Sequence, residues 1–402
     1  MGKSNSPFRI SNIVLIFAII QFSSCNLFDT IEQVGNAKLL WRTTLPIGYS
    51  IGNIGNVQYN NGVLLNRLEN DAGIVYFIDG ATGAIRWKWN DALQDDRLYF
   101  SQVYQNGKCM VAATGTGLYG IDLETGRTLW KKQLSQYGNT ITGLGDSFYL
   151  LTSAYSAVDD TYIMNVARGN LQDGTFADVI TQKNNWPKSY SAEPVTIGAD
   201  EGLLIIQQKK ISAGKYQTSF SLYNQTKFNW EYQERLVDTK KYNSKRAIFN
   251  VNKSSVLFGS DSTIYAITTT TASVEWARKQ STDIELVKCL ANGNLIAIAP
   301  DDTMYALNPI TGNQLWQQKT YSPSELIELN NGIYLFEFKK GLLLSSTNYF
   351  SAIDANNGRV MWRFEDENRY DRKINVLESA NGGNGSVVLC NSTTVFCYEA
   401  IN

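Results

Sequence analysis

The side chains that most often perform acid–base or nucleophilic chemistry are scarce in this sequence. Its 402 residues include no histidine, which is the usual general base and metal ligand near neutral pH. Serine–histidine–aspartate triads, cysteine–histidine pairs and ordinary zinc sites are therefore excluded. Paired carboxylates remain, for example Asp95-Asp96, Asp159-Asp160 and Asp301-Asp302. We interpret them as hydrated acids near turns, and we predict no catalytic residue, no metal site and no bound cofactor.

The cysteines do not have the spacing of a CxxC metal or redox motif. Cys109 and Cys289 stand singly in apolar strand patterns, so we expect them to be small core residues. Cys390 and Cys397 flank an expected hairpin turn, and they would face each other only if Thr393-Thr394 formed that turn. The sequence leaves open whether these two thiols form a disulfide.

The first 24 residues have the pattern of a targeting segment. Lys3 and Arg9 precede or flank an apolar run whose core, Ile13–Ile20, is too short to cross a bilayer. The following Phe22-Ser23-Ser24-Cys25 resembles a bacterial lipobox, with phenylalanine in place of the usual leucine. The resemblance implies cleavage before Cys25 and a lipid on its thiol, which would anchor the protein in a membrane. An ordinary secretory signal cut near residue 24 is the alternative.

The composition favours strands and does not suggest a nucleic-acid partner. Loss of residues 1–24 would remove two of the 36 basic residues and none of the 37 acidic ones, which leaves a net charge near −3. Since no basic block stands out, we expect no nucleic-acid partner. Aromatic residues make up 12% of the chain and proline occurs only 7 times, a balance typical of a strand-rich fold.

A hairpin motif recurs along the chain and predicts the fold. Clear copies are Val75–Trp87, Leu118–Trp130, Met304–Trp316 and Phe350–Trp362. In each, an apolar strand ends at Asp or Asn, which can bond to the turn backbone, and four residues later a glycine supplies a positive φ. These turn glycines are Gly83, Gly126, Gly312 and Gly358. A second strand then carries tryptophan at the fourth position after the glycine.

The spacing of the motif gives the number of repeats. The tryptophans in the motif position are Trp41, Trp87, Trp130, Trp230, Trp276, Trp316 and Trp362. The distance from Trp130 to Trp230 is two periods, so a degenerate copy must lie between them, and Tyr162–Val179 fits, with Asp173-Gly174 as its turn and Asp178 in the tryptophan position. A period of 40–50 residues is typical of a β-propeller of four-stranded blades.

We predict an all-β fold, an eight-bladed β-propeller of four-stranded antiparallel blades, with seven blades as the alternative if the 140–190 region forms no full blade. The last blade needs both ends of the chain, because residues 39–45 lack three preceding strands and residues 374–398 supply three strands with no fourth. Pairing the N-terminal strand with the C-terminal strands would close the ring and remove its open edges. The expected segments are a signal peptide at 1–24, a lipidated tether at 25–37 and a single domain at 38–402.

The repeats resemble the pyrroloquinoline-quinone (PQQ)-type propeller repeat. Tyr305-Ala306-Leu307-Asn308 and Tyr265-Ala266-Ile267 match its signature closely, and the resemblance covers nearly all of residues 38–400. In that family the tryptophan of each outer strand docks on the neighbouring blade. The resemblance therefore implies that the seven tryptophans named above are structural and bind no cofactor.

The lipobox and eight such repeats together are similar to the BamB-type lipoproteins. This similarity implies a non-catalytic scaffold that is anchored in the outer membrane through Cys25, on its periplasmic face, and assists the assembly of β-barrel outer-membrane proteins. The implied partners are the barrel-inserting subunit or other envelope proteins. The propeller itself would be a monomer within that complex. No contact motif of that family is recognisable in this sequence, so the resemblance assigns no binding residue to this chain. The basic hairpin Leu203–Tyr223 is a departure that would suit a different partner.

Two other functions remain as alternatives. A surface-exposed lipoprotein could bind glycans or proteins through loop aromatics, for which the candidates are Tyr49, Tyr137, Tyr155, Trp186 and Tyr190. A PQQ-dependent dehydrogenase would share the repeats. Enzymes of that kind hold the quinone against a disulfide between adjacent cysteines, and no Cys-Cys pair occurs here.

Overall fold

The structure is a computed structural model that describes residues 34–401 except for several short segments, the longest being 94–101 and 234–248. For residues 180–254 it describes the backbone of the strands but not the side chains. All regular elements in the described residues are β-strands. None of those residues belongs to a helix long and apolar enough to cross a membrane.

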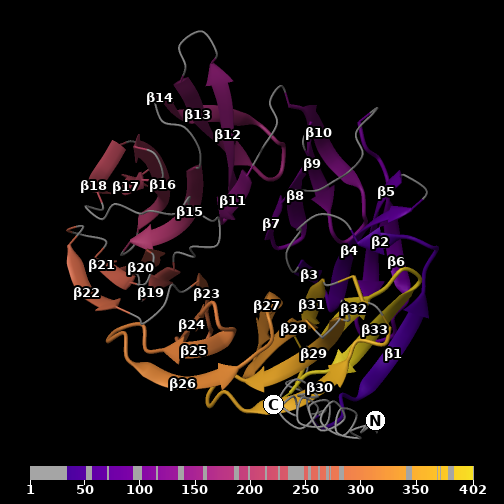
Figure 1. Cartoon of the computed structure of the whole chain (residues 1–402). Coiled ribbons are helices and arrows are strands. Elements are labelled where there is room, and N and C mark those ends of the chain that lie inside the picture. Colours follow the sequence, from indigo (N-terminus) through magenta and orange to yellow (C-terminus); the bar gives the residue numbers. More distant parts are fainter. Residues whose placement is uncertain are drawn as a thin grey trace, which may run out of the picture.

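The described residues form eight antiparallel sheets, which follow one another around a ring in Figure 1. The first sheet contains β2 (Tyr49–Ser50), β3 (Gln58–Tyr59), β4 (Gly62–Glu69), β5 (Ala72–Asp79) and β6 (Ile85–Trp89). The next two contain β7 (Gln102–Asn106), β8 (Cys109–Ala113), β9 (Gly117–Asp122) and β10 (Thr128–Gln133), then β11 (Thr140–Leu144), β12 (Ser147–Ser156), β13 (Thr161–Asn170) and β14 (Phe176–Asn184).

The remaining sheets continue in chain order. Two contain β15 (Tyr190–Ile197), β16 (Asp200–Ser212), β17 (Lys215–Asn224) and β18 (Lys227–Gln233), then β19 (Phe249–Val251), β20 (Ser255–Ser260), β21 (Thr263–Thr268) and β22 (Val274–Lys279). Two more contain β23 (Glu285–Cys289), β24 (Leu295–Ile298), β25 (Thr303–Leu307) and β26 (Gln314–Lys319), then β27 (Ser324–Leu329), β28 (Gly332–Lys340), β29 (Ser346–Asp354) and β30 (Val360–Glu365). The last joins β31 (Ile374–Leu377), β32 (Ser386–Cys390) and β33 (Thr394–Glu399) to β1 (Leu39–Thr44).

The all-β propeller class predicted from the repeats is confirmed, with four-stranded antiparallel sheets as its unit. The eight-blade count stays a prediction, which the eight described sheets support. Closure of the ring by the N-terminal strand also stays a prediction. It is supported by the pairing of β1 with β33, in which Leu39 lies opposite Tyr398 and Thr44 opposite Thr394.

The turn of the repeated motif forms because its first residue bonds to the turn backbone. Asp79 Oδ1 accepts hydrogen bonds from the N–H groups of Ala81 and Thr82, at 3.1 and 2.9 Å. Gly83 then adopts a φ of +74°, and the pairing of β5 with β6 shifts register between Phe77 and Ile78. A side chain at that φ is strained, which explains why glycine recurs at this place. Gly126, Gly312 and Gly358 have φ values of +70°, +70° and +77°.

Trp87 and several of the other motif tryptophans contact the turn of the next sheet. The indole Nε1 of Trp87 donates to the carbonyl of Leu123 at 2.9 Å, and a Cβ on Gly126 would lie 2.6 Å from the same ring. Trp41, Trp130 and Trp316 make equivalent bonds to Gly80, Leu171 and Ala355. The missing side chain of each glycine thus makes room for an indole. We infer that these tryptophans hold adjacent sheets together.

The degenerate copy at residues 162–179 has the same construction. Asn170 begins the turn by accepting the N–H of Gln172, and Gly174 has a φ of +67°. Asp178 stands in the tryptophan position, opposite Ala167. The ring of Trp130 still packs on Gly174, so this sheet receives an indole from its neighbour although it has no tryptophan at its own motif position.

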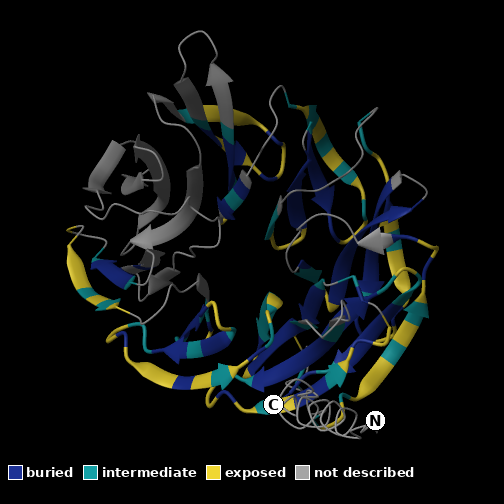
Figure 2. Cartoon of the chain, viewed as in Figure 1, coloured by how far each residue is buried: buried dark blue, intermediate teal, exposed yellow. Residues whose placement is uncertain are grey.

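Most of the core clusters contain side chains of two neighbouring sheets, and the strands with buried residues are dark blue in Figure 2. One cluster joins the sheets of β2–β6 and β7–β10 through Phe77, Trp89, Met110 and Tyr119. The exposed residues gather on the outermost strands, which are yellow and teal in Figure 2. Burial therefore occurs mainly between sheets, and the stability of the ring depends on these contacts.

Candidate functional site

A cavity of about 530 Å³ opens among the strands nearest the centre of the ring. It is lined by residues of β3, β23, β27 and β31 and of the segments that follow them: Gln58, Lys288, Ala291, Glu325, Leu326, Ile327, Glu328, Leu329, Asn330, Ile374, Val376 and Glu378. Four sheets thus contribute strands to one hollow, with β27 supplying the longest part of its wall. Three glutamates and one lysine give it a polar, charged lining.

A bulge on β27 aims one of these glutamates. The pairing of β27 with β28 shifts register between Ser324 and Leu326, and Glu325 between them has a φ of +46°. An extra residue in one strand turns a side chain away from its ordinary direction, and a positive φ in a residue with a side chain is a strained arrangement. The Glu325 carboxylate lies 3.4 Å from the ammonium of Lys373, at the start of β31.

A second carboxylate is held deeper in the wall. Glu328 Oε1 accepts the backbone N–H of Ala291 at 2.7 Å, and its Oε2 lies 3.9 Å from Lys288 Nζ. The side chain of Glu328 is only 8% exposed. Burial raises the pKa of Glu328 and lowers the pKa of Lys288, while the attraction between them opposes both shifts. Burial, followed by the nearby Glu328 carboxylate, also raises the pKa of the Cys289 thiol.

Gln58 connects the inner strands of three sheets at the edge of the cavity. Its Oε1 accepts the backbone N–H of Glu378 at 3.1 Å, beyond the end of β31. Its own N–H donates to Gln105 Oε1 on β7 at 3.2 Å, and the Gln105 amide donates back to the Gln58 carbonyl. The edge is therefore cross-linked by hydrogen bonds, and it presents amide and carboxylate groups at fixed positions.

This arrangement can bind polar groups through carboxylates and amides that are held in place. Two of its glutamates already have lysine partners, so the lining contains matched charges with one further carboxylate at Glu378. Among the residues that the structure describes, no group of three or more metal-ligating side chains of the Cys, His, Asp and Glu types is found. We therefore treat the cavity as a candidate contact site for polar groups of a partner.

Of the acidic pairs considered from the sequence, the described one, Asp301-Asp302, does not line this cavity. Asp301 and Asp302 lie in the turn before β25, where Asp301 is 61% exposed and 3.7 Å from Lys319. The hydroxyl of Thr303 donates to Asp301 and is the main cause of its lowered pKa. This agrees with the interpretation as a hydrated turn acid. The pairs at 95–96 and 159–160 lie outside the described residues.

The two C-terminal cysteines are not paired. The turn between β32 and β33 is built on Asn391, whose Oδ1 accepts the N–H groups of Thr393 and Thr394. In the resulting register Cys390 lies opposite Val395 and Cys397 opposite Val388. Neither of them forms a disulfide; both are buried, as is Cys109, while Cys289 is partly buried.

Several other residues that the sequence suggested as functional lie outside the described residues, or have side chains that the structure does not describe. Residues 1–33, which include Cys25, and the loop aromatics Tyr137 and Trp186 are not described. Tyr49, Tyr155 and Tyr190 lie in strands whose side chains at these positions are not described, and the same holds for Trp230 and for the lysines of the Leu203–Tyr223 hairpin. Their roles stay predictions.

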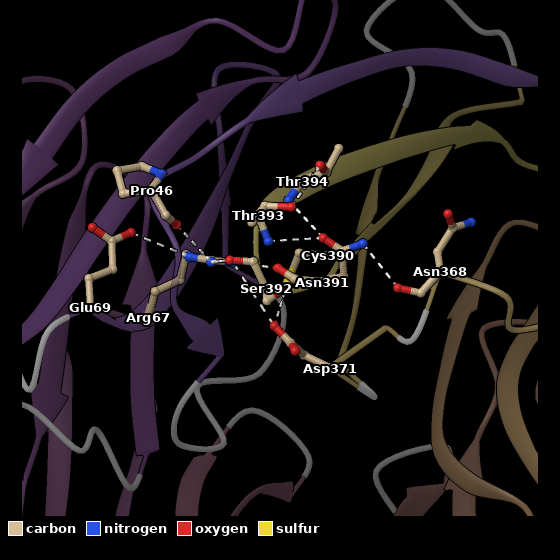
Figure 3. Close-up of polar contacts among 10 residues, drawn as sticks. All are labelled: Pro46, Arg67, Glu69, Asn368, Asp371, Cys390, Asn391, Ser392, Thr393 and Thr394. Carbon is tan, nitrogen blue, oxygen red and sulfur yellow. Dashed lines mark hydrogen bonds and ion pairs between the residues drawn. The ribbon is translucent and has the colours of Figure 1, made fainter.

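Sequence reasoning missed a buried cluster around Arg67, shown in Figure 3. Arg67 on β4 is fully buried, and its guanidinium donates to the carbonyls of Asn391 and Ser392 at 3.0 and 2.8 Å. Its Nε lies 3.5 Å from Glu69 Oε1, and its Nη1 lies 4.0 Å from Asp371 Oδ2. The one available signal was an arginine and a glutamate within the strand Gly62–Glu69, which is otherwise mostly apolar.

The chain is similar to known proteins in sequence pattern and in fold. The family model described as outer membrane protein assembly factor BamB matches residues 34–226 and 230–399. Among solved structures, the chain is similar to BamB from Moraxella catarrhalis, with 15% identity, a TM-score of 0.56 and coverage of 90% of this chain and 100% of that one. A search of the curated proteins found no match.

Two further solved structures show how widely this architecture is used. Sqt1 from Saccharomyces cerevisiae has 9% identity, a TM-score of 0.65 and coverage of 92% of this chain and 100% of that one. The quinohemoprotein alcohol dehydrogenase from Comamonas testosteroni has 10% identity, a TM-score of 0.59 and coverage of 90% and 77%. At such low identities the likeness shows the fold alone.

Proposed function

The chain belongs to the family of outer membrane protein assembly factor BamB, and we propose that it is a non-catalytic envelope scaffold that assists the assembly of β-barrel outer-membrane proteins. The observation that carries the proposal is the family match, which spans both halves of the propeller from residue 34 to residue 399. The resemblance predicted from the repeats is thereby confirmed at the level of the family.

Anchoring completes the proposal. Residues 1–24 would be removed as a signal peptide, and Cys25 would carry the lipid that holds the protein on the periplasmic face of the outer membrane. The support is the order of features in the sequence, with a basic start, an apolar run and Phe22-Ser23-Ser24-Cys25. Several acyl chains on one residue anchor a protein firmly, because each buried CH₂ contributes about 0.8 kcal/mol.

A scaffold role also suits the central cavity. Its carboxylates are positioned by a bulge, by a backbone N–H and by lysines, so the polar groups keep their places before any partner arrives. A rigid, prearranged surface loses little conformational entropy on binding. We propose that a partner's polar segment contacts this cavity and that the propeller acts through binding.

The experiment is a crosslinking pull-down from detergent-solubilised membranes. A photoreactive residue is placed at Glu378 in the cavity, and a matched one is placed at exposed Asn357 on an outer turn. We expect a subunit of the barrel-assembly machinery to be captured in stoichiometric amounts from the Glu378 position and not from Asn357. The Cys25→Ser protein, which cannot be lipidated, is the control for membrane attachment.

Other outcomes would redirect the proposal. If only surface transport or glycan-uptake proteins are captured, the assembly role is wrong and the surface-binding function replaces it. If the assembly subunit is captured equally from both positions, the scaffold role stands and the cavity is not its contact site. If the Cys25→Ser protein stays in the membrane fraction in processed form, the lipid anchor is wrong.

A further inference from the structure

The chain enters the propeller along the outer strand of a neighbouring sheet. Val34 N–H donates to the Arg363 carbonyl at 3.1 Å, and Arg363 N–H donates to the Val34 carbonyl at 2.7 Å. This is an antiparallel bridge to β30, and β30 belongs to the sheet that precedes the one joined by β1. The first described residue is therefore attached to the outside of the ring, at the boundary between these two sheets.

The next residues fix this entry point. Gly35 has a φ of +59°, and a Cβ on it would lie 2.6 Å from the Met361 carbonyl, so the backbone lies directly against β30. Ala37 packs on the core cluster between the two sheets, and the Lys38 carbonyl accepts the N–H of Glu399 at 2.9 Å. The segment 34–38 is thus held along its length.

The distance from this point to the proposed lipid is short. Nine residue steps separate Cys25 from Val34, and a fully extended chain of that length reaches about 30 Å. A compact domain of about 365 residues has a radius of gyration near 21 Å, so its far side lies roughly 50 Å from the entry point. A membrane that holds Cys25 can therefore lie close to this side of the ring without reaching the opposite side.

The surface around the entry point has apolar side chains directed to solvent. Leu39 and Leu40 on β1 are 45% and 44% exposed, and Met361 on β30 is 38% exposed. Basic side chains stand among them, with Lys38 and Arg42 on the β1 side and Arg359 at the start of β30, all exposed. Apolar groups flanked by lysine and arginine suit the boundary between acyl chains and anionic headgroups.

We propose that this outer surface, defined by Val34, Leu39, Leu40 and Met361, faces the lipid bilayer, and that the propeller stands on its edge against the membrane. The inference rests on the proposed anchor at Cys25. It gives the scaffold a fixed orientation, because the central cavity then opens parallel to the membrane plane and both faces of the ring stay accessible to partners. The occupant of the surface is the lipid itself.

The test uses the lipidated full-length protein in vesicles of phosphatidylethanolamine and phosphatidylglycerol that contain a headgroup-attached fluorescence quencher. A fluorophore is placed on Met361→Cys, and a matched one on Phe176→Cys in β14, which lies across the ring from β30 in Figure 1. Both positions are exposed, at 38% and 37%. Labelling of the parent protein corrects for reaction at the mostly buried native thiols.

We expect quenching at Met361→Cys to exceed that at Phe176→Cys at least about threefold, because the far side is held beyond the reach of the headgroups. A 20-residue Gly-Ser insertion between Asp29 and Thr30 should abolish the difference. Equal quenching at the two positions with the original tether, or stronger quenching at Phe176→Cys, would overturn the edge-on orientation. Co-sedimentation of the protein with vesicles, compared with Cys25→Ser, reports separately on the anchor, so a failed anchor is distinguished from a wrong orientation.

Discussion

Two fully or nearly buried arginines use their charge in different ways. Arg363 on β30 donates twice to Glu337 on β28, at 2.7 and 3.0 Å, so its ion pair lies within one sheet. Arg67 on β4 reaches out of its sheet to the turn of Asn391 and Ser392 between β32 and β33. The first guanidinium mainly satisfies a carboxylate, and the second mainly satisfies backbone carbonyls of the neighbouring sheet.

The difference shows that a buried charge can stabilise either a single sheet or the boundary between two neighbouring sheets. Glu337 is fully buried and also accepts hydrogen bonds from Ser351 and from the N–H of Tyr321, so the Arg363 pair is part of a closed polar network. Arg67 has Glu69 at 3.5 Å and Asp371 at 4.0 Å, both longer than the carbonyl contacts. Loss of Arg363 should therefore leave a charge unpaired, whereas loss of Arg67 should separate two sheets.

The largest expected effect is that of Arg363→Met. Removal of one partner leaves the Glu337 carboxylate buried without its cation, and a broken buried pair costs about 3–5 kcal/mol of unfolding free energy. Equilibrium unfolding in urea measures the loss. Arg359→Met, at an exposed position on the turn before the same strand, is the matched control and should change stability by less than about 0.5 kcal/mol. A loss below 1 kcal/mol in Arg363→Met would show that the pair is dispensable.

Arg67→Met should cost somewhat less, about 3 kcal/mol, because neutral carbonyls are left unpaired along with one carboxylate. The informative measurement is hydrogen exchange. We expect protection to fall first in β1 and β33, whose pairing flanks the Asn391–Ser392 turn, while the sheet of β7–β10 keeps its protection. Arg86→Met, which breaks a partly exposed pair with Asp79, controls for loss of charge. Uniform loss of protection would mean that Arg67 supports the whole ring and not one boundary.

An ordinary boundary without a buried arginine provides the next comparison. Gly126→Val places a branched side chain at a φ of +70° and against the ring of Trp87, and the backbone strain alone costs about 1–3 kcal/mol. Thermal and urea unfolding should both show the loss. Gly107→Val has a φ of +54° with open space around its Cβ, so it reports backbone strain without the indole contact. If the two variants are equally destabilised, the indole contact contributes little to the boundary.

The smallest expected effect is at a surface ion pair across that same boundary. Lys131 donates to Asp91 at 2.8 Å, and with Thr128 it lowers the pKa of Asp91 below its ordinary value of 3.8. A lowered carboxyl pKa adds stability above the unfolded pKa, and that stability is lost as pH falls through the folded pKa. Asp91→Asn should therefore cost about 0.5 kcal/mol at pH 7, and the cost should disappear as pH falls through the lowered pKa of Asp91. A cost that persists unchanged in acid would show that the charge is not the cause.

The repeat predicted most of the fold because its physics is local. Asp79, Gly83 and Trp87 stand within nine residues, and each has a role that residue type and spacing alone determine: a turn acceptor, a positive φ and a bulky ring on one strand face. The degenerate copy was found by the same spacing, since Gly174 stands one period after Gly126. The boundary contact of each indole followed from the family resemblance.

The cavity and the arginine clusters could not be predicted in this way, because they depend on contacts between distant residues. Gln58 meets Glu378, and Arg67 meets Asn391, across separations of more than 300 residues that no motif encodes. The positive φ at the bulge falls on Glu325 and not on a glycine, so the residue type gives no sign of it in the sequence. The interruption of an apolar strand by Arg67 was the one visible sign, and its partner could be identified only once the sheets were placed side by side.

The pairing of β1 with β33 also determines when the protein can finish folding. Leu39 and Tyr398 are paired although they lie near opposite ends of the chain and are translated at different times. Until the last strand arrives, β1 presents unpaired N–H and C=O groups, and contacts of such long range form slowly. The edge of β1 therefore stays open until β33 is available, so the final step of folding is the one most exposed to aggregation.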